Sequence, residues 1–185
     1  MKLKYAGISG LSLDELVAIV SKDGYQIQNV STQTNSVCLA AVAQNGDALK
    51  HVEPYLRTEA VCLAAVQQNG HALRFVFESN RTAQLELAAV TKTGDALQYV
   101  VFRTDVVNLA AVKQDGYALK HVGRQTEEIC RAAIQQNPAA LSRVRDREMF
   151  IQMALEFKID TDISPLVDEA LLAERADEAC ASPAP

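Results

Sequence analysis

The cysteines are the first residues in this sequence that could support chemistry. Cys38, Cys62 and Cys130 occupy the same position of a repeated pattern, and that position holds Glu86 and Asn108 in two other copies. Because polar residues share the position, we expect it to lie at the edge of the core and to be partly exposed. Stacked repeats would hold equivalent residues about 10 Å apart, beyond the limit of about 7 Å for a disulfide. The sequence therefore predicts free thiols.

Two other kinds of cysteine chemistry are alternatives. A structural zinc site commonly uses ligands about two to four residues apart, and no pair in this chain has that spacing. A nucleophilic cysteine needs a neighbouring base that lowers the pKa of its thiol, and the sequence offers no such pairing. We therefore expect no metal site, no cofactor and no catalytic residue.

The histidines, aromatic residues and cations favour binding rather than catalysis. Two histidines recur at one position of a predicted second helix in each repeat, and Phe, Tyr and Arg take that position in other copies. Residues three positions apart share a helix face, so these side chains form one polar and aromatic stripe with their neighbours. The candidate partner-binding residues of this stripe are Lys50, His51, His71, Arg74, Phe75, Gln98, Tyr99, Tyr117, Lys120, His121 and Arg143.

This stripe has two interpretations. Aromatic residues and arginine are typical anchors of protein interfaces, and the inner helices of a solenoid line a concave surface that usually serves for binding. The sequence leaves open which face of the array is concave. The stripe is therefore predicted to bind a protein partner. The structural alternative is that the rings shield the apolar side of each second helix, with solvated charges beside them.

The elements that position the stripe follow from an internal repeat. Each copy of the repeat has a leucine, or a residue that replaces it, at one position. A capping residue stands five positions before that leucine in every copy. The capping residues are Ser12, Thr34, Thr58, Thr82, Thr104, Thr126 and Asp146. They are 22, 24, 24, 22, 22 and 20 residues apart, which is typical of a short two-helix unit. Their side chains can accept a hydrogen bond from the first turn of a helix, so a helix is predicted to begin at each.

Each predicted first helix carries an apolar run of the type Val-x-Leu-Ala-Ala-Val and stops at a glycine. These glycines are Gly24, Gly46, Gly70, Gly94 and Gly116. We expect them to adopt the left-handed conformation that often ends a helix. A shorter helix then follows, and the units must stack to cover their apolar faces. The predicted fold is all-α, an α-solenoid of 22–24-residue two-helix repeats with a C-terminal capping helix.

The ends of the chain define its domain organisation. The repeat array is predicted over residues 1–163, with units starting near 12, 34, 58, 82, 104, 126 and 146. Ser164 caps and Pro165 opens an acidic closing helix over 164–180, which is expected to cover the last incomplete unit. Residues 181–185 are predicted to be a frayed tail.

Charge and hydropathy restrict the class of partner. The formal net charge is -5, and residues 156–185 hold eight acids against two bases. The remaining residues are close to neutral, which argues against the phosphate contacts of a nucleic-acid partner. No segment approaches the roughly 20 apolar residues of a membrane span, and no signal peptide is recognised. We therefore expect a cytoplasmic protein with no membrane partner.

The pattern Leu-Ala-Ala-Val-x-x-x-Gly-x-Ala-Leu-x-x-Val resembles the family known as domain of unknown function 4116 (DUF4116). The resemblance covers roughly residues 34–144 and is clearest over 37–52, 61–76, 85–100 and 107–122. It implies tandem short helical repeats. The family is met largely in proteins of intracellular bacteria and protists, some regarded as delivered into host cells, so it also implies a role within a bacterial effector or regulator. It has no established catalytic residues, and none is carried over.

The expected function is a non-catalytic protein-protein interaction module, a helical repeat scaffold. The alternative is a self-associating or autoinhibited regulator that uses its acidic C-terminal helix, and self-association would produce a homo-oligomer. A nucleic-acid-binding repeat is a distant alternative, because some helical repeats read one base per unit. An enzyme ranks last, because the sequence has no phosphate loop, no His-Glu-x-x-His and no nucleophile elbow.

Overall fold

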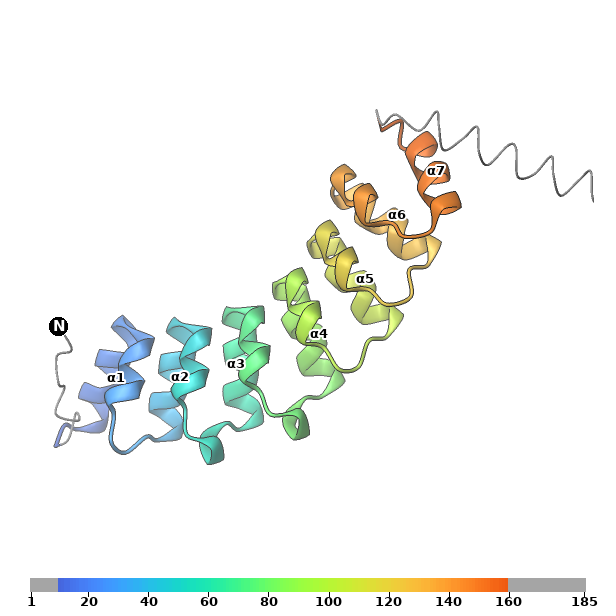
Figure 1. The fold of residues 1–185 in the computed structure, drawn as a ribbon. Helices are drawn as coiled ribbons and strands as arrows, with labels where there is room; N and C mark the ends of the chain where they lie inside the picture. Colours follow the sequence, from blue (N-terminus) through green and yellow to red (C-terminus); the bar gives the residue numbers. More distant parts are fainter. Residues whose placement is uncertain (1–9, 160–185) are drawn as a thin grey trace, which may run out of the picture.

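The computed structural model describes residues 10–159 of the chain. These residues form six units, each an α-helix of ten residues followed by a 3-10 helix of six, and a further α-helix ends the row (Figure 1). The α-helices are α1 (Leu13–Lys22), α2 (Asn35–Gln44), α3 (Glu59–Gln68), α4 (Ala83–Lys92), α5 (Asp105–Gln114), α6 (Glu127–Gln136) and α7 (Arg147–Glu156). The paired 3-10 helices are η1 (Gly24–Asn29), η2 (Gly46–His51), η4 (Gly70–Phe75), η6 (Gly94–Tyr99), η7 (Gly116–His121) and η8 (Pro138–Arg143). The predicted all-α repeat fold is confirmed over the described residues, which contain no β-strand.

Every α-helix begins at its predicted capping residue. The Thr34 hydroxyl accepts a hydrogen bond from the N–H of Val37 at 3.4 Å, and the other five Ser and Thr caps, like the Asp146 carboxylate, accept in the same way. Ser12 adds a reciprocal capping box, because its own N–H donates to the Glu15 carboxylate at 2.8 Å. Each such cap stabilises a helix by about 1 kcal/mol, so local sequence defines where each helix starts.

The glycines that follow the α-helices differ from the prediction. Within residues 10–159, Gly10 is the one glycine with a left-handed backbone. A Cβ added at Gly46 would lie 2.4 Å from the backbone oxygen of Ala65 in the next unit. The predicted left-handed helix ends are therefore wrong: the glycines are needed because the next α-helix passes too close for any side chain.

The residue before each glycine reverses the chain. Asn45, for example, is extended with φ at -146°, and its N–H donates to the carbonyl of Ala41 at 2.9 Å, which ends α2. Its side-chain oxygen accepts the N–H of Asp47 at 3.0 Å, which begins η2. Asn or Asp performs both tasks in five units, whereas Thr93 makes no such side-chain bond in the fourth. One short polar residue thus ends the first helix and starts the second.

The core runs without interruption from the first unit to the sixth. Cys38, Cys62 and Cys130 are fully buried within it, and Glu86 and Asn108 at the equivalent position are buried as well. The expected partial exposure of this position is therefore wrong. A neighbouring unit stacks over a position that would lie at the edge of a single helix pair. The three thiols are free, as predicted.

Glutamine side chains link neighbouring units beside the turns. The Oε1 atom of Gln44 accepts the N–H of Gly24 in the preceding unit at 2.8 Å, and that of Gln68 accepts the N–H of Gly46 at 2.7 Å. Equivalent bonds occur at Gly94 and Gly116, and each gives a partner to the first N–H of a 3-10 helix, which has none in its own helix. The units are therefore joined by polar contacts as well as by the core.

Arginine side chains link neighbouring units at the other end of the helices. The residue directly before the capping threonine is Arg57, Arg81 or Arg103 in the middle units. The guanidinium of Arg81 donates to the carbonyls of Val76 at 3.1 Å and Leu73 at 3.2 Å in the preceding unit, and to that of Tyr99 at 2.8 Å in the next. A cation suits the partial negative charge at the C-terminal ends of two helices. Nothing in the sequence pattern had identified this role.

The row of units is curved (Figure 1). The loops that lead from one unit to the next lie along the outer side of the curve, whereas the turns between each α-helix and its 3-10 helix lie along the inner side. The two 24-residue units place their extra residues in short 3-10 turns on the outer side, η3 (Pro54–Leu56) and η5 (Glu78–Asn80). The concave edge is therefore lined by these turns and not by the second helices alone.

The end of the row departs from the regular stacking. Pro138 replaces the glycine of the turn, and α7 packs with η8 around a separate small core that includes Ile134, Leu141 and Met153. Arg131, which replaces the leucine of α6, forms ion pairs with Glu127 and with Glu156 of α7. The predicted closing helix over 164–180 and the tail over 181–185 lie outside the described residues.

Candidate partner-binding surfaces

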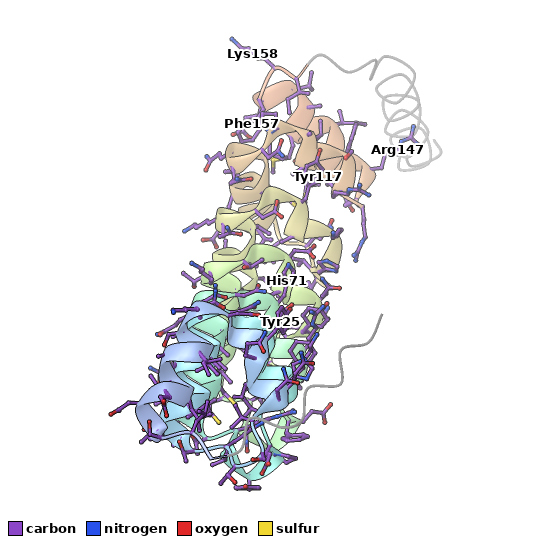
Figure 2. The ribbon with its side chains drawn as sticks, turned by 90° about the vertical axis from the view of Figure 1, so that its left-hand side faces the viewer. Tyr25, His71, Tyr117, Arg147, Phe157 and Lys158 are labelled. Carbon is purple, nitrogen blue, oxygen red and sulfur yellow. The ribbon has the colours of Figure 1, made fainter. Side chains whose placement is uncertain are left out.

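The 3-10 helices bring the predicted stripe together on one side of the row. Its residues are the second, fifth and sixth of each 3-10 helix, and the second residue of one unit faces the fifth and sixth of the next. Figure 2 shows Tyr25, His71 and Tyr117, from the first, third and fifth units, following one another along the array. The stripe is thus a ladder of contacts between units.

Two rungs of the ladder are ionic. Arg74 pairs with Asp47 of the preceding unit at 2.9 Å. Asp95 accepts from the Lys120 ammonium at 2.7 Å and lies 3.1 Å from the Nε2 atom of His121. The hydrogen bond from Lys120 lowers the pKa of Asp95 below its ordinary 3.8, and His121 acts in the same direction. The Asp95 carboxylate is therefore ionised at neutral pH, and both carboxylates are engaged within the protein.

The other rungs pair rings with rings or with cations. The rings of Tyr25 and His51 form a T-shaped pair with their centroids 6.0 Å apart, and the Lys50 ammonium lies 4.7 Å from the Tyr25 ring centroid. His71 meets Tyr99 of the next unit at 6.1 Å. These contacts are worth about 0.5–1.5 kcal/mol each at half-exposed sites, so together they help to fix the angle between units.

The remaining stripe residues complete the same pattern. The guanidinium of Arg143 lies 5.9 Å from the ring of Tyr117 in the preceding unit. Arg74 also covers the ring of its neighbour Phe75 at 4.6 Å, and the amide of Gln98 donates to Asp95 at 2.6 Å in its own unit. Each predicted site residue is therefore on this surface, and each contacts another residue of the protein.

The buried thiols and a half-buried histidine have shifted pKa values. Burial raises the pKa of Cys38 and of Cys130 to about 11, and it raises that of Cys62 as well. Burial, assisted by the charge of Lys50, lowers the pKa of His51. The thiols are therefore protonated at neutral pH, which opposes nucleophilic or metal-binding use. Among the described residues, no three His, Cys, Asp or Glu side chains are placed to hold a metal ion.

The α-helices present a second surface, which the sequence analysis had assigned wholly to packing. The leucine and first alanine of each motif contact the core on one side but remain half exposed on the other. These half-exposed residues are Leu39, Ala40, Leu63, Ala64, Leu87, Ala88, Leu109 and Ala110. They form an uncharged stripe across α2 to α5, which we call the leucine stripe.

A groove of about 490 Å³ opens on the leucine stripe between α3 and α4. It is lined by Gln67, Gln84, Leu87, Ala88, Thr91 and Lys92. Charged residues flank the stripe at the helix ends: exposed Glu59 and Asp105 at the helix starts, and exposed Lys92, which also lines the groove, and exposed Lys113 near the helix ends. The surface is therefore apolar in its middle, acidic along one margin and basic along the other.

A known family of repeats matches part of the chain. Residues 36–81 match the family model described as Domain of unknown function (DUF4116). The resemblance drawn from the motif is therefore confirmed over that segment, which spans α2, η2, α3 and η4 and so covers two successive units. Neither the curated proteins nor the solved structures yield a match to the chain. No helix of the described residues is long and apolar enough to cross a membrane.

Proposed function

We propose that this chain is a non-catalytic scaffold that binds a protein partner along the leucine stripe. The observation that carries the proposal is the stripe itself: half-exposed leucines and alanines follow one another across four α-helices and open into an apolar groove. Contiguous exposed apolar surface with a polar rim is typical of interaction sites in soluble proteins. A rigid row of units can present such a surface over a long distance.

The chemistry of the stripe favours an amphipathic helix as the partner's docking element. Such a helix can place leucine-like side chains into the shallow grooves between neighbouring α-helices. Its flanks would carry basic residues towards Glu59 and Asp105 and acidic residues towards Lys92 and Lys113, because those charges border the stripe on opposite margins. This arrangement would fix the direction of the bound helix.

The 3-10 ladder is the second candidate surface. Its cations are exposed, and Lys50 and Arg143 lie over tyrosine rings rather than beside carboxylates. These two charges could meet acidic groups of the protein partner that the stripe was predicted to bind. We rank this surface below the leucine stripe because its other charges, such as Arg74 and Lys120, already form ion pairs within the protein.

Two observations support a binding role over catalysis. The candidate nucleophiles are buried, protonated thiols. The three histidines take part in the ladder, His51 and His71 through ring contacts and His121 beside Asp95. A place within a bacterial effector or regulator rests on the family resemblance alone.

The proposal is tested by identifying the partner and then blocking the groove. Crosslinking capture in the native cell would name the partner, and titration calorimetry with its docking peptide would measure affinity. We expect the double change Ala64→Gln and Ala88→Gln, which fills the groove while sparing the leucines, to weaken binding at least tenfold. Circular dichroism would check that this groove variant, and the control variant described next, keep their helices.

The matched control alters the opposite side of the row. The double change Lys50→Gln and Arg143→Gln removes two exposed cations from the ladder and should leave affinity within about threefold. Unchanged binding by the groove variant, with binding lost in the ladder variant, would place the partner on the 3-10 helices and overturn the proposal.

A further inference from the structure

A pocket of about 270 Å³ lies open at the C-terminal end of the 3-10 row. It is lined by Tyr117, Pro138, Ala139, Leu141, Ser142, Phe150 and Ile159. These residues come from η7, η8, α7 and the last described residue. In the earlier units, the 3-10 helix of the following unit packs at this place, whereas η8 is followed by α7 and no further 3-10 helix up to residue 159.

The contacts between successive 3-10 helices also stop at η8 within the described residues. The second residue of each earlier 3-10 helix contacts the next unit, as Asp95 contacts Lys120 and Tyr117 contacts Arg143. The equivalent residue of η8 is Ala139, which is exposed at the pocket. Within residues 10–159, the pocket therefore lies where a seventh rung of the ladder would stand, and its lining is mostly apolar.

The segment that follows residue 159 is long enough to reach this pocket. Ile159 itself lines the pocket, so the chain leaves the described structure at the pocket's rim. Residues 160–165 can span about 20 Å at the usual rise of an extended chain. They lead to the apolar residues Leu166, Val167, Ala170 and Leu171. A tethered segment also has a high effective concentration at a site this close.

The net negative charge of residues 160–180 also complements the cations near the pocket. Residues 160–180 contain seven acids and one base. Arg143 is exposed over the ring of Tyr117, which lines the pocket. Two residues further along the chain, exposed Arg145 donates from its guanidinium to the carbonyls of Gly123 and Lys120, each at 3.1 Å. Both guanidiniums are held in place by these contacts. An acidic segment with an apolar side therefore complements an apolar pocket with a cationic rim.

We propose that residues 160–180 dock intramolecularly in this pocket, with Leu166, Val167 and Leu171 against the apolar wall and the flanking acids beside Arg143 and Arg145. The segment would complete the array in place of a seventh second helix. This inference does not depend on a partner binding the leucine stripe.

Paramagnetic relaxation in the full 185-residue chain tests the proposal. A nitroxide is attached through Ala170→Cys in a Cys180→Ser background, and the other cysteines, Cys38, Cys62 and Cys130, resist labelling because they are buried. We expect amide signals of η8 and Tyr117 to lose intensity while those of η2 keep theirs, and reduction of the nitroxide to restore them. Equal intensities at η8 and η2 would overturn the proposal.

Two controls separate docking in the pocket from other contacts. Ser142→Glu adds a negative charge at the pocket and should abolish the loss of intensity, whereas Gln28→Glu, at the same position of η1, should not change it. Both residues are exposed, so both variants should fold. A loss that persists in Ser142→Glu, or one that appears only between spin-labelled and isotope-labelled copies mixed together, would refute intramolecular docking.

Discussion

At the residue scale, one position of the α-helices is filled by cysteine in three units and by Glu86 and Asn108 in two others. All of these side chains are buried. The Glu86 carboxylate accepts the N–H groups of Val101 at 2.8 Å and Phe102 at 2.9 Å, and so fixes the following loop. The Asn108 side-chain oxygen is buried without a hydrogen-bond partner. At the same position, Glu86 thus stabilises a loop in one unit, whereas the unpaired oxygen of Asn108 destabilises the folded protein in the next.

Replacing these two residues by the cysteine of the other units should have opposite effects. Glu86→Cys leaves two backbone N–H groups without their acceptor and should lower the free energy of unfolding by about 1–3 kcal/mol. Asn108→Cys removes an unsatisfied buried oxygen and should raise the same quantity by about 1 kcal/mol. Urea unfolding followed by circular dichroism measures both. A change of the same sign in the two variants would contradict the assigned contacts.

The glycine of the turn gives a second prediction at this scale. Gly46→Ala places a Cβ against the Ala65 backbone oxygen, 2.4 Å away, and backbone cannot move aside as a side chain can. We expect the free energy of unfolding to fall by about 1–3 kcal/mol. Gly123→Ala is the matched control, because no atom lies within 4 Å of its added Cβ. That variant should be as stable as the parent or slightly more stable, since alanine restricts the unfolded chain.

At the scale of elements, contacts along both ends and one side of the helices determine how two units meet. Gln44 and its equivalents link the turns, Arg81 and its equivalents link the 3-10 helix ends, and the ladder links the 3-10 faces. The helices are short, and isolated helices of ten or fewer residues are marginal in water. Their stability therefore comes from these neighbours and from the shared core.

The ionic rung at Asp95 predicts a pH dependence. The pKa of this carboxyl is lowered in the folded protein, so its contribution is complete above its ordinary pKa of 3.8 and disappears as the pH falls through the folded value. At neutral pH, Asp95→Asn should reduce the free energy of unfolding by up to about 1 kcal/mol, because the pair is partly exposed. The difference between the parent and the variant should shrink below about pH 4. Urea titrations at several pH values measure it, and a difference that grows with acidity would be inconsistent with the rung.

At the scale of the whole molecule, residues 10–159 form a row in which the extensive contacts of each unit are with its neighbours along the chain. Its stability should then be close to a sum of unit and interface contributions. The two terminal units differ from the rest. The first has only one stacking neighbour, and the last carries Pro138, Arg131 and α7 in place of a regular successor.

Deleting one whole unit tests this linear organisation. Removal of residues 104–125 joins Arg103 directly to Thr126 and leaves Gly94 facing the α6 helix that Gly116 faces in the parent. We expect a folded protein with the same helical signal per residue and a lower midpoint of urea unfolding. Removal of residues 105–115, which deletes α5 but keeps η7, should instead abolish cooperative unfolding. Equal behaviour of the two deletions would exclude the linear description.

The sequence by itself determined the local features of this protein. Capping residues such as Thr34 act within one helical turn, so their pattern located all seven α-helix starts. The repeat of capping residues and apolar runs also identified the units and the family that residues 36–81 match. The stripe residues were placed on one surface because their spacing depends only on helical geometry.

The tertiary structure alone decided what each position does between units. The burial of the cysteines depends on the stacking of neighbouring units. The close approach of Gly46 to Ala65, the bond from Arg81 to Tyr99 and the pairing of Asp47 with Arg74 join residues 18 to 27 positions apart in the sequence. The half exposure of Leu63 and Leu87 has the same origin, because it depends on which side of each α-helix the next unit leaves uncovered. A repeat pattern reports what one unit contains, and the surfaces it exposes are fixed only when the next unit stacks upon it.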